Sequence, residues 1–310
     1  MNEFVRNTLL VLCALALGFL TLEVGVRLYR PDIRLLTLTN FIYDQVSLLR
    51  SGYPSRFDAE LGYIPRPGYS GIANVWGTQV TIDQQGVRSN GQPPPDAVEA
   101  PAILALGDSF VFGDQVSDSE TWPAQLERKL RQRVINGGVF GYAVDQSVLR
   151  AYPLIDRYQI GTIILTFIAD DIRRTQLAVR TGVAKPYFEL DHGDLIRRND
   201  PVPPLAQEDR GVGLLRSILG YSLLLDLAMK RLGLEEWWYA GRWSTVQVHD
   251  DGVEVACRLI DQLRRDTAAR GIHLVVLAQY PSWEITDPDA PKNRQSQELT
   301  QALLACLRQG

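Results

Sequence analysis

Four short apolar runs alternate with longer helix-like stretches, and this alternation constrains the fold more than any other feature. The runs cover residues 102–106, 134–136, 162–168 and 273–278. Each has the length of a strand, and the segments between them are long enough for crossover helices. We therefore predict an α/β fold with a mostly parallel sheet and helices on both faces, a three-layer α/β/α sandwich.

The composition of the 310-residue chain excludes several classes of partner. Its net charge is -4 with no stripe of Lys and Arg, so we do not expect it to bind nucleic acid. Phosphate-loop and dinucleotide-binding glycine motifs are absent, and we expect no metal, nucleotide or organic cofactor. The cysteines, Cys13, Cys257 and Cys306, lie far apart without a CxxC pair, and we predict unpaired thiols rather than a disulfide or zinc site.

An apolar segment begins near the amino terminus. Residues 8–22 are free of charge, and Glu23 and Arg27 follow them. We predict a transmembrane anchor over residues 1–27, which makes membrane lipid a partner. A cleaved signal peptide is the alternative, because residues 14–16 have a small-x-small form. Counting Lys and Arg alone would keep the following domain in the cytoplasm, since more of them follow the segment than precede it.

The remaining chain divides by composition into two parts. Residues 28–99 are typical of an extended, strand-poor lead-in with one possible hairpin at 76–87, and they end in a proline-rich linker. The α/β domain covers residues 100–310, with an insertion at about 173–250. That insertion contains a predicted hairpin that turns at 191–194 and an apolar helical stretch at 214–232.

Polar and glycine-rich segments follow three of the predicted strands. Gly107-Asp108-Ser109 follows the first strand, a glycine-rich segment from Asn136 to Gly141 ends the second, and Ala169-Asp170-Asp171 follows the third. The carboxyl ends of parallel strands meet at one edge of a sheet, so these segments should lie close together. A serine hydroxyl beside backbone N–H donors is the arrangement that acyl transfer requires.

These three segments, in this order, resemble the conserved blocks of the SGNH/GDSL hydrolase superfamily, and the lead-in resembles its bacterial membrane-anchored members. The resemblance implies a flavodoxin-like strand order, Ser109 as nucleophile, and Gly141 as an amide donor to the oxyanion. Asp170 stands where the family has an oxyanion-donating Asn. It further implies an exported, membrane-anchored serine esterase or acyl-carbohydrate hydrolase, whose periplasmic or extracytoplasmic domain acts on a small-molecule or carbohydrate ester.

Two departures from the family pattern predict weak catalysis. The fourth block, Asp-x-x-His, supplies the family's base, and His192, His249 and His273 lie in no such block. Because Gly310 comes before the strand that would carry this block, we expect the α/β domain to be incomplete at its carboxyl end. An ionised Asp170 accepts hydrogen bonds only, so it would repel an oxyanion.

Two other functions are compatible with the same residues. A non-catalytic binding or assembly protein could keep the fold while lacking the base and the Asn. A third possibility is an ordinary flavodoxin-like domain, in which Gly-Asp-Ser forms only a turn or a phosphate-binding loop.

Overall fold

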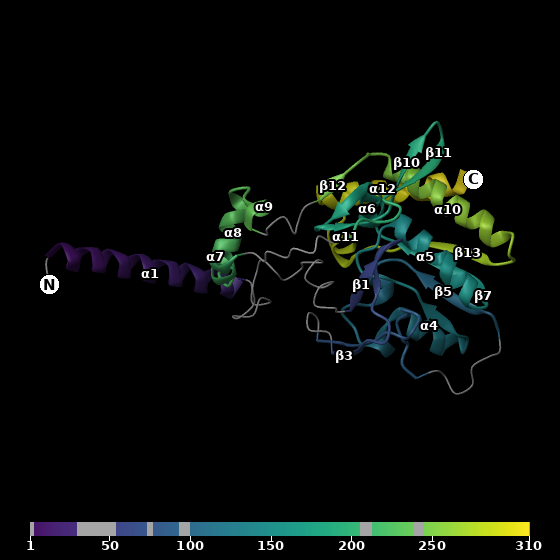
Figure 1. Ribbon diagram of the computed structural model, residues 1–310, viewed down its shortest axis with the longest axis horizontal. Helices are drawn as coiled ribbons and strands as arrows, with labels where there is room; N and C mark the ends of the chain where they lie inside the picture. The colour runs from purple at the N-terminus through teal and green to yellow at the C-terminus, as the bar shows by residue number, and fades with distance from the viewer. Residues whose placement is uncertain are drawn as a thin grey trace. The chain divides into compact units, whose positions relative to one another are not determined.

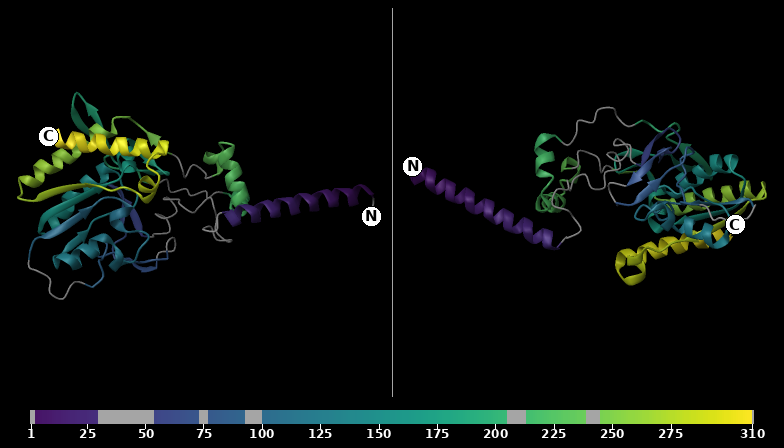
Figure 2. Two further views of the ribbon diagram at one scale, coloured as in Figure 1. Left: turned by 180° about the vertical axis from the view of Figure 1, so that it is seen from behind. Right: turned by 90° about the horizontal axis from the view of Figure 1, so that it is seen from below.

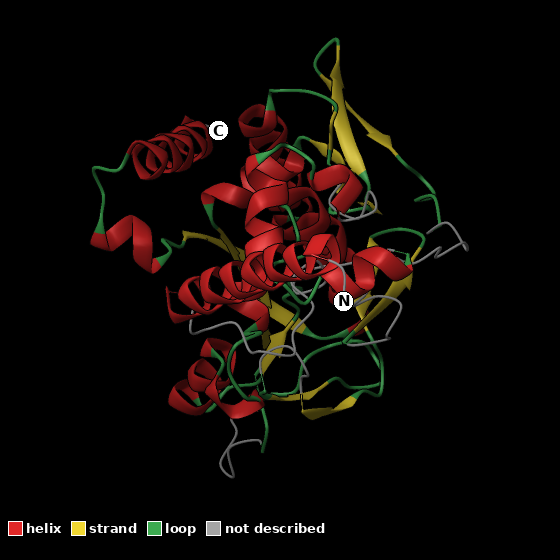
Figure 3. Cartoon of the chain, turned by 90° about the vertical axis from the view of Figure 1, so that its left-hand side faces the viewer, coloured by secondary structure: helices red, strands yellow, loops and turns green. Residues whose placement is uncertain are grey.

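A computed structural model describes residues 3–29, 54–72, 77–92, 100–204, 213–238 and 245–309, drawn in colour in Figures 1, 2 and 3. The chain forms two compact units, one made of residues 1–47 and 206–244 and the other of residues 48–205 and 245–310. The second unit contains the parallel sheet. The first contains the apolar N-terminal helix and part of the insertion.

The sheet contains the four predicted strands. They are β5 (Ala102–Leu106), β6 (Val134–Asn136), β7 (Ile160–Phe167) and β13 (His273–Ala278), hydrogen-bonded in the order β13-β7-β5-β6. All three pairings are parallel. The predicted α/β class with a parallel sheet is therefore confirmed.

Each connection between these strands contains a helix that packs on the sheet. The chain passes from β5 to β6 through α4 (Trp122–Leu130), and α5 (Val144–Arg157) carries it back across β5 to β7. Helix α10 (Gly252–Ala268) continues in the same direction to β13. Right-handed crossovers place helices on opposite faces when the direction reverses. Figure 1 shows α4 on one side of the strands and α5 and α10 on the other.

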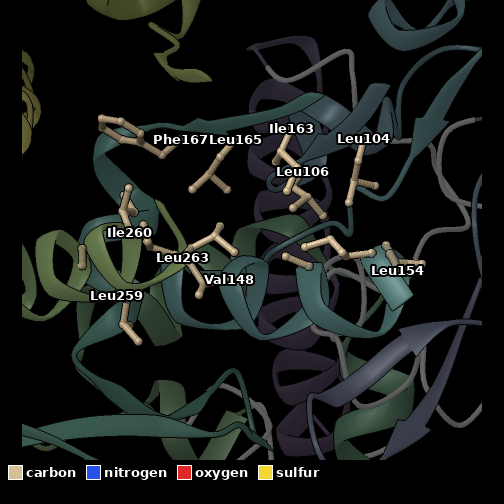
Figure 4. Packing of buried hydrophobic residues seen from close by; sticks show 14 of the residues in the cluster. Leu104, Leu106, Val148, Leu154, Ile163, Leu165, Phe167, Leu259, Ile260 and Leu263 are labelled. Carbon is tan, nitrogen blue, oxygen red and sulfur yellow. The ribbon is translucent and has the colours of Figure 1, made fainter. Parts of the chain in front are cut away.

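The core follows the two-residue period of the strands. One set of alternate side chains, Leu104 and Leu106 of β5 and Ile163 and Leu165 of β7, points toward α5 and α10 (Figure 4). The other set packs with the apolar face of α4, and the cluster on that side contains Ile103, Ala105, Val111, Val134, Trp122 and Leu126. Both faces of β5 are therefore buried, as its continuous apolar run predicts.

The outer strand, β13, is covered on one face only. Leu274 and Val276 pack against the core beside α10, whereas Val275 and Leu277 are 40% and 46% exposed. On this side α4 packs with β5 and β6, and among the described residues no helix buries Val275 and Leu277.

A disulfide bond links Cys257 of α10 to Cys306 of α12 (Pro291–Gln309). The prediction of unpaired thiols at these positions is wrong. The pairing depends on how α12 packs along α10, and the sequence spacing of 49 residues gives no sign of that contact. Cys13 is a free, exposed cysteine on the N-terminal helix.

The lead-in contains more strands than its sequence predicts. β1 (Ser55–Asp58) pairs with β2 (Gly62–Pro65), and β3 (Ser70–Ile72) pairs with β4 (Gln79–Thr81), both antiparallel. These short strands show no clear alternation of apolar and polar residues, and β1, β3 and β4 contain only one large apolar residue each. Gly86 does lie in a turn, at a φ of 74°, but Trp76 of the predicted hairpin lies outside the described residues, as does the proline-rich linker.

The insertion folds largely as predicted. β10 (Tyr187–Asp191) and β11 (Asp194–Arg198) form the hairpin, and β8 (Leu177–Arg180) pairs with β9 (Val183–Ala184) and β12 (Val246–Gln247). The helical stretch is divided into α7 (Leu214–Leu219) and α8 (Leu223–Arg231), followed by α9 (Glu235–Trp238). In the same unit, α1 (Glu3–Tyr29) is long and apolar enough to cross a bilayer.

Removing the disulfide is expected to destabilise the unit that contains the sheet. The disulfide closes a loop of 49 residues and so lowers the entropy of the unfolded chain, which stabilises the folded state by about 4 kcal/mol. We expect Cys257→Ser with Cys306→Ser to lower the free energy of unfolding by roughly that amount, measured by urea denaturation of the full chain in detergent micelles. Cys13→Ser is the matched control and should leave the midpoint unchanged. Equal midpoints for the double variant and the parent would contradict the pairing.

Candidate functional site

The candidate nucleophile, Ser109, lies directly beyond the carboxyl end of β5. It is the first residue of the short helix α3 (Ser109–Phe112), and the Asp108 side chain caps this helix by accepting a hydrogen bond from the Phe110 amide at 3.0 Å. Asp108 is buried, whereas Ser109 is partly exposed. In the described part of the chain, no hydrogen bond ties the Ser109 hydroxyl to another residue.

A buried arginine from the lead-in holds the other end of α3. The Arg88 guanidinium donates to the carbonyl oxygens of Phe112 at 2.6 Å and Val116 at 2.7 Å, and also to that of Gly113. Its Nε donates to Asp118 at 3.1 Å. The last carbonyl groups of a helix lack partners within the helix, and a cation satisfies them well. Arg88 therefore fixes the element that carries Ser109.

The glycine-rich segment lies against this element because Gly138 has no side chain. The Val139 amide donates to the Gly107 carbonyl at 3.0 Å. A Cβ on Gly138 would lie 2.5 Å from the Phe112 nitrogen, so only glycine fits there. Gly141 has a φ of 72°, and its carbonyl accepts a hydrogen bond from Arg180 at 3.2 Å. These contacts join the first two predicted segments.

The third segment begins α6 (Ala169–Thr175), immediately after β7. The buried Asp171 carboxylate accepts a hydrogen bond from the Ile168 amide at 3.0 Å and so caps α6. Asp170, whose side chain is 46% exposed, forms an ion pair with Arg173 at 2.7 Å. The neighbouring acids therefore differ, since one is structural and buried while the other faces solvent.

The Arg174 guanidinium joins the three segments. Its Nη1 lies 2.7 Å from Asp171 Oδ1 and 3.6 Å from Asp108 Oδ2, and it donates to the Tyr142 carbonyl at 3.2 Å. Each of these partners is the chain neighbour of a predicted site residue: Ser109, Gly141 and Asp170. The predicted meeting of the three segments is present in the structure, although Arg174 itself was not predicted.

Burial perturbs the charges around Arg174. It raises the pKa of Asp108, and together with the nearby Asp108 charge it raises the pKa of Asp171 well above the ordinary value. Burial alone would lower the pKa of Arg174, but Asp171 and Asp108 outweigh it and raise that pKa. Burial and the Arg174 charge lower the pKa of Arg180. Two arginines therefore face two carboxyl groups in a poorly solvated region.

A further carboxyl group lies at the same edge of the sheet. Helix α11 (Ser282–Thr286) follows β13, and its Glu284 is buried with Oε2 unpaired among the described residues. Burial and the Asp170 charge raise the pKa of Glu284. Arg173 also donates to the Ser296 hydroxyl at 3.0 Å. The rule of strand carboxyl ends would have pointed to this segment, since it follows the fourth strand.

The histidines lie elsewhere. His192 occupies the β10–β11 turn with its side chain 97% exposed, His273 begins β13 at the opposite edge, and His249 pairs with Asp251 before α10. Across the described ranges, no hydrogen bond or ion pair connects a histidine to Ser109, Gly141 or Asp170. The site therefore has no imidazole base among these residues.

Neither a metal cluster nor a known relative assigns a function to this site. Within the described ranges, no group of three or more His, Cys, Asp or Glu side chains is placed to hold a metal ion. Asn136 is fully buried, and its Oδ1 accepts a hydrogen bond from the Gly138 amide at 3.2 Å, so it supports the glycine segment.

No family model matches the chain, and no curated protein matches it.

Substitution of Arg174 should destabilise the fold far more than substitution of its neighbour. Arg174→Ala leaves Asp108 and Asp171 buried without their cation, which typically costs about 3–5 kcal/mol. Arg173→Ala, which removes a half-exposed pair, is the matched control and should cost no more than about 1 kcal/mol. Urea denaturation of the full chain measures both. Similar losses for the two variants would contradict the bridging role of Arg174.

The carboxyl group of Asp114 should make stability depend on pH. Burial, reinforced by the nearby Asp108 charge, raises its pKa from 3.8 to about 6. Between these values the folded chain binds more protons than the unfolded chain, so this group makes the free energy of unfolding fall as pH rises.

We therefore expect Asp114→Asn to stabilise the protein at pH 7 relative to the parent, by up to about 2–3 kcal/mol more than at pH 4. Denaturation curves at several pH values measure the difference. A difference that does not change with pH would show that Asp114 has an ordinary pKa.

Proposed function

We propose that the chain is a membrane-anchored serine esterase or acyl-carbohydrate hydrolase of SGNH/GDSL type with impaired activity. The observation that carries this proposal is the bridge made by Arg174, whose partners are the chain neighbours of Ser109, Gly141 and Asp170. The site also lies where the chain reverses direction across the sheet, between β5 and β7. Ligands of open α/β sheets bind at this position.

The finer fold is part of the same proposal. Numbered along the chain, the four parallel strands lie in the order 2-1-3-4, which is the flavodoxin-like order without a fifth strand. We infer that α4 belongs to one outer layer of a three-layer sandwich and that α5 and α10 belong to the other. On the side of α4, the face of β13 that carries Val275 and Leu277 is not covered by a described helix.

The chemistry would proceed through an acyl-serine. Ser109 Oγ adds to the acyl carbon, the Gly141 amide donates to the oxyanion, and the alcohol leaves with a proton. Water then adds to the acyl carbon of the acyl-serine, the bond to Ser109 Oγ breaks, and the carboxylic acid is released as the hydroxyl is restored. With no histidine beside Ser109, its proton passes to solvent, which slows the first step greatly. Asp170 forms an ion pair with Arg173 at 2.7 Å. A carboxylate only accepts hydrogen bonds, so it adds no donor to the oxyanion.

These last two features favour a second function, a binding or assembly protein that keeps the site without turnover. The paired Asp170 and the absence of a described histidine at Ser109 are the observations behind it. Both proposals share the same candidate ligand class, a small-molecule or carbohydrate ester.

We place the α/β domain outside the cytoplasm, in the periplasm or its equivalent. Disulfides persist in oxidising compartments and are rare in the cytosol, so the bond between Cys257 and Cys306 supports export. Helix α1 has the length and composition of a single membrane anchor. We weigh the disulfide and the anchor more heavily than the count of Lys and Arg around the apolar run, which favours a cytoplasmic domain.

A fluorophosphonate probe tests the esterase directly, because it phosphonylates a serine that acts as a nucleophile, at a rate that depends on how strongly the serine is activated. We expect slow labelling of the full chain in detergent, with the modified peptide containing Ser109, and slow hydrolysis of p-nitrophenyl acetate. Ser109→Ala should abolish both. Asp170→Asn supplies the missing donor, and we expect it to raise turnover by roughly 10²-fold.

Labelling no greater than that of Ser109→Ala, with no gain in Asp170→Asn, would overturn the esterase and favour the binding protein. The fold of each variant is checked by its urea midpoint.

A further inference from the structure

Near the carboxyl end of the apolar helix α1, two of its side chains form hydrogen bonds to the insertion. Glu23 accepts hydrogen bonds from the amides of Leu223 at 3.0 Å and Leu224 at 2.9 Å, and from the Ser222 hydroxyl at 2.8 Å. Arg27 donates to Glu23 at 2.7 Å and to the Tyr221 carbonyl at 2.6 Å. The first turn of α8 is therefore fixed beside the last turns of α1.

This connection sets the depth of α8 relative to a bilayer. The charge-free run at residues 8–22 ends immediately before Glu23. At 1.5 Å per residue it measures about 22 Å, against a hydrocarbon core of about 30 Å. A carboxylate at the end of this run lies near the boundary between acyl chains and headgroups. The amides that bind Glu23 lie at the same depth.

The helix that precedes α8 exposes a continuous apolar face. Leu214, Leu215 and Ile218 of α7 are 79%, 63% and 61% exposed, and their spacing places them on one side of the helix. Tyr221 and Trp237 are 45% and 48% exposed. Tyr and Trp are enriched where acyl chains meet headgroups.

We propose that α7, Tyr221 and Trp237 form a lipid-binding surface that lies in the headgroup–acyl boundary of the bilayer that α1 spans. The contact with Glu23 favours lipid over a second copy of the chain, because it holds this surface at the membrane boundary. Residues 213–238 contain three basic and three acidic residues, so acyl contact rather than attraction to anionic lipid provides the binding. The proposal rests on α1 crossing the membrane and is independent of the esterase chemistry.

Spin labels on the full chain test the depth of this surface. In a Cys13→Ser background, single cysteines are introduced as Ile218→Cys, Leu15→Cys and Leu130→Cys, and the protein is placed in phosphatidylcholine nanodiscs. Leu130 is the matched control, since it is an apolar side chain of the other unit with 48% exposure. Collision rates with oxygen and with a water-soluble nickel chelate give the depth of each label.

We expect the Ile218 label about 5–10 Å below the phosphates, as in interfacial helices, and the Leu15 label near the bilayer centre. An Ile218 label above the phosphates, as accessible to nickel as the Leu130 label, would overturn the proposal. So would protection of the Ile218 label from both reagents with spin–spin broadening, which would indicate a second copy. A Leu15 label in water would instead refute the membrane span.

Glu23→Ala tests whether the hydrogen bonds to Glu23 position the lipid-binding surface. We expect the Ile218 label to move toward water in this variant while the Leu15 label keeps its depth. An unchanged Ile218 depth would show that Glu23 does not position the surface and would overturn the depth argument.

Discussion

The site depends on one cation, 15% exposed, that lies between two buried carboxyl groups. Arg174 lies between Asp108 and Asp171, and each of these acids caps a different helix at the edge of the sheet. Two carboxylates so close together in a poorly solvated region would repel each other and take up protons. The guanidinium makes their proximity favourable, and its bond to the Tyr142 carbonyl includes the glycine segment in the same arrangement.

The parallel sheet was predictable because its strands carry a strong local signal. Each of the four runs is short and apolar, and turn or helix residues bound it, so its length and composition identify it. The lead-in strands β3 and β4 lack that signal, since each contains only one large apolar residue. The bond between Cys257 and Cys306 was not predicted because it depends on the packing of α12 against α10, which cannot be inferred from the spacing of the cysteines.

For the site, the sequence could indicate which segments meet but not what holds them together. The rule of strand carboxyl ends brought the segments of Ser109, Gly141 and Asp170 to one edge. Nothing in the sequence distinguishes Arg173 from Arg174, yet their side chains are 31% and 15% exposed, and only the second lies between two buried acids. The position of a charge among other side chains is a property of tertiary packing, so Arg174 could not be assigned from local pattern alone.

Arg88 makes the lead-in part of the candidate site, although it precedes the parallel sheet in sequence. Its guanidinium occupies the carbonyl end of the helix that begins at Ser109, and its backbone amide donates to Asn136 at 3.2 Å. A fragment cut at residue 100 would keep every predicted site residue but leave these carbonyl groups buried without a donor. The lead-in, including β4, whose Gln79 carbonyl also accepts from Arg88 at 3.2 Å, is therefore part of the structure that supports Ser109.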